Sequence, residues 1–313
     1  MCNQEWFNAK KSEKIMKAGL GDRRAKKIAD FLLFALPNLA RVFILNNHNF
    51  SEEDNKKFFD NPDDPLEHKP KYHQWGIITH TKMFDKFYNK EVLEYLEDWE
   101  IMDFVMDKMI QKIDGLEKYN LLNIVIPLHD LGKFVARKIK TEDDGSISYS
   151  FEGHEIASGK LIRENDVLSI ILRHGYYLTD AQMEYIARCA ELHYTLGVVR
   201  DRAKKLEMGY SFKFTKSASI FEWTMEIFEN YPDFAIEIGI LFLADCLAKT
   251  DIHIEANSDA EIGAQDLSIK EMIQERGLDA RLIGAIKQLP VSVEVAKIYL
   301  QTLVRLSSSE LRY

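Results

Sequence analysis

Hydrophobic residues recur at helical spacing through most of the chain, which predicts a mainly helical protein. The first such stretch covers residues 12–45, where Pro37 is expected to break the helix. Residues 76–115 carry the spacing of two helices, and residues 120–138 carry that of one. The same spacing recurs over residues 180–196, 217–230, 233–250 and 268–305.

The hydrophobic spacing changes from helical to alternating after residue 138. Ile139 lies on one side of an Asp-Asp-Gly-Ser run, and Ile147, Tyr149 and Phe151 occupy alternating positions on the other. Alternation around an Asp-Gly pair predicts a short β-hairpin. Helices are expected to resume at His154, because Gly153 permits a tight entry into the first helical turn. We therefore expect an all-α helical bundle with one small β-hairpin inserted into it.

A Pro- and Asp-rich connection at residues 61–71 indicates a boundary in the chain. We expect an N-terminal helical segment over residues 1–70 and a central domain over residues 71–260. Residues 261–313 are then expected to form a C-terminal helical extension.

Composition limits the class of protein. The 313 residues are 46% hydrophobic and 29% charged, which is typical of a soluble globular protein. A net charge of −9 disfavours broad binding to nucleic acid. The first residues carry no signal-peptide pattern, and polar residues interrupt the apolar stretches at 28–45 and 234–248, so no membrane span is predicted. Cys2, Cys189 and Cys246 lack paired or metal-type spacing and are expected as free thiols, which favours the cytoplasm.

The strongest chemical signal is the doublet His129-Asp130, which ends an apolar run. Neighbouring residues on a helix point about 100° apart, so both side chains can approach one metal ion. Lys133 lies three residues after Asp130 and four after His129, on the adjacent helical surface, where an ammonium group can meet a substrate phosphate. Imidazole and carboxylate donors suit Fe, Mn, Ni, Zn or Mg.

Further metal-type side chains lie on separate helical stretches: His80, His154, His193 and Asp245. Asp245 is the most informative of them, because a carboxylate inside an apolar helix is costly unless it is paired or bound to metal. Lys249 follows one turn later and either pairs with Asp245 or is solvated. The other histidines are expected to be structural or exposed: His48, His68 and His73 in polar loops, His174 at a helix end, and His253 at the surface.

The order of these motifs resembles the HD-domain metal-dependent phosphohydrolases. The closest likeness, over roughly residues 75–255, is to the HD domain appended to some bacterial CCA-adding tRNA nucleotidyltransferases. The motifs that carry it are His80-Thr81, His129-Asp130-Leu-Gly-Lys133, the Asp-Gly hairpin, Gly153-His154-Glu155, His193 and Asp245. The nucleotidyltransferase domain itself is not visible. The run at residues 196–201 lacks the first glycine of that domain's Gly-Gly-x-Val-Arg-Asp element, and we expect a helix end and loop there.

The resemblance implies an all-α fold with His80, His129, Asp130 and Asp245 as primary metal ligands. It also implies that His154 and His193 line a phosphate pocket or hold a second ion. We therefore expect a hydrolase of phosphate mono- or diesters that takes a small, nucleotide-like substrate. Asp130, Lys133, His154 and His193 would support its catalysis.

Three points stay open in the sequence. We expect one tightly held divalent ion and a weaker second position, although two equivalent ions fit the same ligands. A di-iron oxygenase of the same fold could use these side chains, and a signalling module with an inactive site is a further alternative. An intact ligand set argues against the inactive module. The oligomeric state is not indicated.

Overall fold

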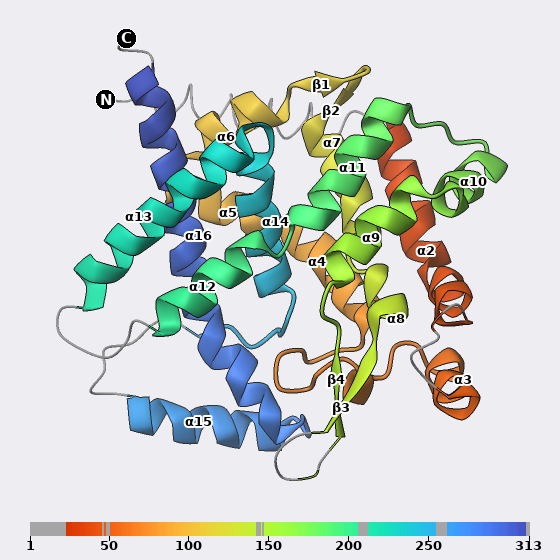
Figure 1. Cartoon of the computed structure of the whole chain (residues 1–313). Coiled ribbons are helices and arrows are strands. Elements are labelled where there is room, and N and C mark those ends of the chain that lie inside the picture. Colours follow the sequence, from red (N-terminus) through yellow and green to blue (C-terminus); the bar gives the residue numbers. More distant parts are fainter. Residues whose placement is uncertain are drawn as a thin grey trace.

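Helices form most of the structure and nearly all of its regular secondary structure, so the all-α prediction is confirmed (Figure 1). The computed structural model describes residues 23–45, 47, 51–141, 145, 147–205, 212–254 and 262–310. The first half contributes α2 (Arg23–Leu45), α3 (Glu52–Asp60), the 3-10 helix η1 (Pro65–Glu67), α4 (Ile77–Tyr88), α5 (Glu91–Asp98), α6 (Met102–Met109), α7 (Lys118–Val125), η2 (Ile126–Leu128) and α8 (Gly132–Ala136). The second half contributes α9 (His154–Arg163), α10 (Asn165–Arg173), α11 (Asp180–Leu192), α12 (Thr195–Lys205), α13 (Phe212–Asn230), η3 (Pro232–Phe234), α14 (Ala235–Leu247), α15 (Ile262–Glu275), η5 (Ala280–Leu282) and α16 (Ile283–Glu310).

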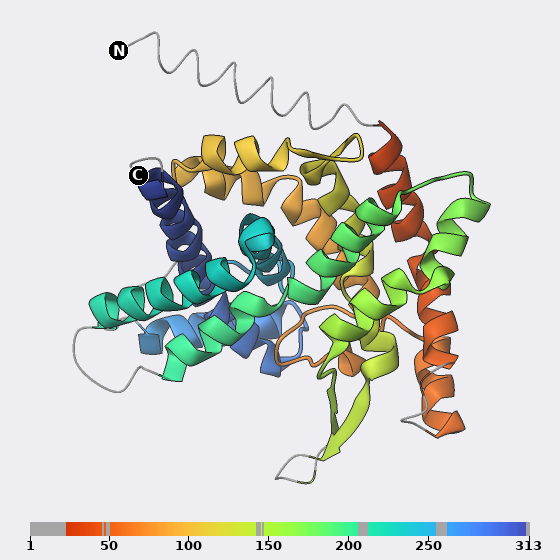
Figure 2. The same cartoon turned by 45° about the horizontal axis from the view of Figure 1, so that its top comes forward.

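The predicted β-hairpin is present and projects from the helical body (Figure 2). Its strands β3 (Lys138–Thr141) and β4 (Ile147–Ser150) pair antiparallel. Residues 142–144 of the predicted turn lie outside the described residues. A second, smaller hairpin, which was not predicted from the sequence, joins β1 (Lys112–Ile113) to β2 (Leu116–Glu117).

The main hydrophobic core surrounds α14, every residue of which is buried. Helices α4, α12 and α16 pack against α14, and the same apolar cluster extends to α2 at the other end of the chain. All three predicted segments contribute to this cluster. The division at residues 70 and 260 stays a prediction.

Helix α2 runs through Pro37 without interruption, so the predicted break is wrong. Proline removes one helical hydrogen bond, but Leu36 and Leu39 on either side of it are buried in the core, and that burial keeps the chain helical. Among the described helices, α2 alone is long and apolar enough to cross a membrane. One of its faces is buried against the rest of the protein, as in an amphipathic helix that covers a core.

Several other predicted boundaries differ from the structure. Residues 76–115 form three helices and β1 rather than two helices, because the chain turns at Glu100, whose φ is 58°. Residues 268–305 divide into α15 and α16, and Gly277 with φ 62° follows the end of α15 as a left-handed cap. Residues 196–201 lie inside α12 rather than in a loop, since Leu196 and Val199 are buried on one face of that helix.

Candidate metal centre

The doublet lies at a break in the helical chain and not within one helix. The expected helix over residues 120–138 is replaced by α7, η2 and α8, and His129 and Asp130 lie between η2 and α8. Pro127 lies in η2, where the missing N–H of proline is tolerated at the start of a helical turn. Both side chains of the doublet are buried by this arrangement.

Gly132 lets α8 approach α9 closely. Its backbone N–H donates to Ser158 Oγ at 2.8 Å, and a Cβ added here would lie 2.0 Å from the carbonyl oxygen of His154. His154 is the first residue of α9, as predicted, and it follows Gly153 with φ 78°. The close approach of the two helices places His154 Nε2 3.3 Å from Asp130 Oδ1.

His80 and Asp245 form the opposite side of the centre. Asp63 fixes the first turn of α4, because its carboxylate accepts from the Thr79 N–H at 2.9 Å and from the Thr79 hydroxyl at 2.6 Å. That turn carries His80, whose Nε2 lies 3.0 Å from Asp245 Oδ1 on α14. Residues that are 165 positions apart in the sequence therefore meet in the core.

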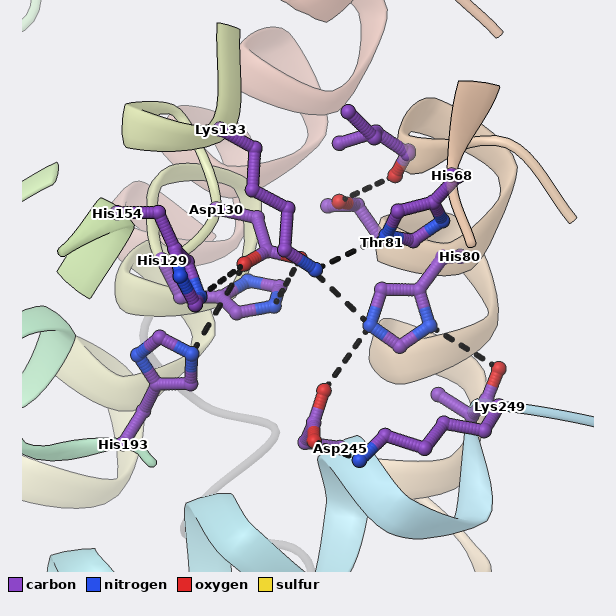
Figure 3. Close-up of polar contacts among 12 residues, drawn as sticks. His68, His80, Thr81, His129, Asp130, Lys133, His154, His193, Asp245 and Lys249 are labelled. Carbon is purple, nitrogen blue, oxygen red and sulfur yellow. Dashed lines mark hydrogen bonds and ion pairs between the residues drawn. The ribbon is translucent and has the colours of Figure 1, made fainter. Parts of the chain in front are cut away.

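All seven predicted site residues lie together around Asp130 and Asp245 (Figure 3). The two oxygens of Asp130 face different partners. Oδ2 lies 3.2 Å from His129 Nε2 and 3.7 Å from His80 Nε2. Oδ1 faces His154 Nε2 at 3.3 Å and His193 Nε2 at 3.8 Å. Asp130 therefore stands between the expected primary ligands and the two additional histidines.

The four histidines of the centre hold their Nδ1 atoms in the same way. In each of them Nδ1 lies within hydrogen-bond distance of a backbone carbonyl oxygen, to which an Nδ1–H would donate. The distances are 3.1 Å from His80 to Ala248, 2.6 Å from His129 to Ile126, 2.8 Å from His154 to Phe151 and 2.6 Å from His193 to Ala190. With the proton on Nδ1, a neutral imidazole presents the Nε2 lone pair to the centre, as metal-binding histidines do.

An Nε2 lone pair that faces a carboxylate oxygen is unfavourable unless a cation lies between the two atoms. Burial and the neighbouring His129 lower the pKa of His193 to about 3. Burial also lowers the pKa of His80, although Asp245 opposes the shift. His129 Nε2 and Asp130 Oδ1 are buried without a hydrogen-bond partner, although other buried polar atoms in proteins are nearly all satisfied.

Two sets of three residues, which share His129, each have donor atoms close enough together to hold an ion. One set is His80, His129 and Asp245, and the other is His129, Asp130 and His193. Within each set the donor atoms all lie within 4.8 Å of one another. The buried cluster can hold a metal ion, and its nitrogen and oxygen donors suit first-row divalent metals.

Each carboxylate also has its own lysine. Lys133 Nζ lies 2.7 Å from Asp130 Oδ2, and Lys249 Nζ lies 3.0 Å from Asp245 Oδ2. Burial tends to raise the pKa of Asp130, but His129 and Lys133 outweigh it and hold that pKa well below its usual range. Lys249 similarly outweighs burial at Asp245, whose pKa is also well below its usual range. The alternative left open for Lys249 is thus resolved as a buried ion pair.

Two histidines that were not predicted to belong to the site lie in this region. His68 and His73 belong to a polar, proline-rich stretch, yet both are buried beside the centre. Their rings stack with centroids 3.9 Å apart, and His73 packs edge-on against His80 with centroids 4.8 Å apart. The close spacing of three histidines, at positions 68, 73 and 80, was the available signal.

The remaining histidines agree with the predictions where they are described. His174 follows α10 as its C-cap, and His253 is exposed. His48 lies outside the described residues. No protein-family model, curated protein or solved structure matches this chain.

Proposed function

We propose that this protein is a metal-dependent phosphohydrolase of the HD superfamily that acts on a phosphate mono- or diester. The observation that carries the proposal is the set of four buried imidazoles, each with Nε2 directed at a carboxylate, together with Lys133 beside Asp130. A small, nucleotide-like substrate is the expected ligand.

The residues present fit a divalent ion by donor type, burial and unsatisfied atoms. His80, His129, Asp130 and Asp245 would hold it, with His154 and His193 available to a second ion across Asp130. Such an ion supplies an activated water and withdraws charge from the phosphoryl oxygen.

Lys133 supports phosphate chemistry over the di-iron oxygenase alternative. Its ammonium lies within the centre, 2.7 Å from Asp130 Oδ2, and the residue is 6% exposed. An ammonium held in a water-poor site stabilises the negative charge that develops on a phosphoryl group in the transition state. The complete ligand set supports an active protein over an inactive signalling module.

The test compares Asp130→Ala with Lys133→Ala in protein purified without chelator. Asp130→Ala should lose both bound metal and hydrolysis of a panel of phosphate esters. Lys133→Ala should keep its metal while activity falls by about 10²–10³-fold, the usual effect of losing one electrostatic stabiliser. Metal content is measured by elemental analysis, and calorimetric titration of stripped protein should find one tight equivalent and a weaker second one.

Equal loss of metal in both variants would show that Lys133 is structural. No hydrolysis of any phosphate ester by the metal-loaded wild type would refute the proposed function. Two equivalents of comparable affinity, of which His154→Ala removes one, would show two ions with His154 as a ligand.

A further inference from the structure

His68 makes two directed hydrogen-bond contacts from a buried position. The residue follows η1 as its C-cap and is 1% exposed. Its Nδ1 lies 2.9 Å from the carbonyl oxygen of Trp75, and its Nε2 lies 2.9 Å from Lys133 Nζ. Figure 3 shows Lys133 extended so that its ammonium group lies between Asp130 and His68.

These contacts fix the tautomer of His68. A lysine ammonium has donors only, so His68 Nε2 must accept from it. A carbonyl oxygen accepts only, so the ring proton is on Nδ1 and is donated to Trp75. Burial and the nearby Lys133 hold the pKa of His68 well below its ordinary value, in agreement with a neutral ring.

The ring of His68 is also held in place by its neighbours. It stacks on His73 and packs edge-on against Phe151, with a centroid distance of 6.0 Å. The segment that carries it is tied to the end of α14, where the N–H of Gln74 donates to the carbonyl oxygen of Lys249 at 2.8 Å. An acceptor fixed in this way can orient a flexible lysine.

We propose that His68 is a positioning residue that aims the Lys133 ammonium at the substrate phosphate, an inference that rests on the proposed function. Asp130 Oδ2, which faces the other side chains of the centre, is also the oxygen that pairs with Lys133 Nζ. If an ion were held at Asp130, the carboxylate would be a weaker acceptor for the lysine, and His68 would remain as an anchor. One of the three ammonium N–H bonds stays on His68 and the others are free to meet phosphoryl oxygens.

The functional test separates the acceptor atom of His68, Nε2, from the packing of its ring. His68→Phe keeps a ring that can stack on His73 but removes the acceptor, whereas the amide oxygen of His68→Gln can replace Nε2. His68→Phe can neither donate to Trp75 nor accept from Lys133, whereas the amide of His68→Gln has both a donor and an acceptor. The contact with Lys133 is therefore isolated by repeating His68→Phe in a Lys133→Met background. His174→Gln is the control, because it makes the same change at an exposed histidine outside the centre, whose ring packs on Phe31.

We expect His68→Phe to weaken the binding of inorganic phosphate to the metal-loaded protein about tenfold, the usual effect of one lost hydrogen bond to a charged group. Metal content should be unchanged, His68→Gln should recover most of the binding, and His174→Gln should match the wild type. In a Lys133→Met background, His68→Phe should have no further effect. An equal loss in that background, or loss of metal, would show a merely structural role and overturn the proposal.

A second measurement needs neither metal nor activity. Nitrogen-15 NMR of the metal-free wild type should show His68 with its proton on Nδ1, and Lys133→Met should shift its Nε2 signal. A proton on Nε2, or an Nε2 signal that Lys133→Met leaves unchanged, would overturn the proposal. If the wild type hydrolyses no phosphate ester, the proposed function fails while this measurement still decides the contact between His68 and Lys133.

Discussion

Buried neutral histidines should make the metal-free protein sensitive to acid. Burial and His129 lower the pKa of His193 to about 3, whereas an unfolded histidine titrates near ~6.5. Burial lowers the pKa of His68, His73 and His80 as well. Because each folded-state pKa lies below the unfolded one, the unfolded chain binds more protons than the folded protein does as the pH falls. The stability present above pH ~6.5 is therefore lost below it.

The size of the effect follows from the proton balance. Between pH 7.5 and 5.0 an unfolded histidine gains about 2 kcal/mol of protonation free energy that a histidine kept neutral by folding does not. His193 alone should therefore lower the free energy of unfolding by about 2 kcal/mol. The other three shift in the same direction and add to this loss, which is an appreciable part of a typical stability of about 5–15 kcal/mol.

Urea unfolding of metal-free protein at several pH values, followed by tryptophan fluorescence, measures this dependence. Toward pH ~5, where an unfolded histidine is almost fully protonated, His193→Gln should reduce the slope of stability against pH by about 1.4 kcal/mol per pH unit, because one proton fewer is taken up on unfolding. Cys189→Ala is the control: it removes a buried side chain from α11 but no imidazole, and should lower stability without changing the slope. Identical slopes for wild type and His193→Gln would refute the reasoning.

Two further predictions concern packing and charge at the centre. Gly132→Ala should destabilise the protein by about 3 kcal/mol and weaken metal binding, because the new methyl group meets the backbone of His154; thermal unfolding and metal titration measure the two effects. Lys249→Met should destabilise metal-free protein by about 3–5 kcal/mol, because it leaves the buried carboxylate of Asp245 unpaired. Added metal should restore part of that loss in urea unfolding, and equal destabilisation with and without metal would contradict the ion-pair argument.

The sequence predicted what local patterns specify. The β3–β4 hairpin and the start of α9 at His154 follow from an Asp-Gly pair and from Gly153, whose effects act within a few residues. The clustering of His80 with Asp245 followed from the chemistry of buried metal-type side chains. Helix continuity at Pro37 was mispredicted because tertiary burial outweighs the local cost of proline.

The role of His68 could not be predicted in the same way. A proline- and aspartate-rich stretch usually lies at the surface, and its residues give no sign of burial. The stretch is buried here because Gln74 and Asp63 tie it to the end of α14 and to the start of α4. Such contacts join segments far apart in the sequence, and the spacing of hydrophobic residues within one segment carries no information about them.

The charges of the centre suggest how metal and substrate binding depend on each other under the proposed function. Asp130 and Asp245 are balanced by Lys133 and Lys249, and His80 and His193 are neutral, so these groups sum to zero without an ion. Protein without metal therefore carries no uncompensated charge among these buried groups, and it can fold before it binds an ion. A divalent ion then leaves two positive charges in surroundings of low dielectric, where their attraction for a phosphate is strong. Substrate affinity should consequently depend on metal occupancy, and by thermodynamic reciprocity a bound phosphate should tighten the hold on the metal by the same factor.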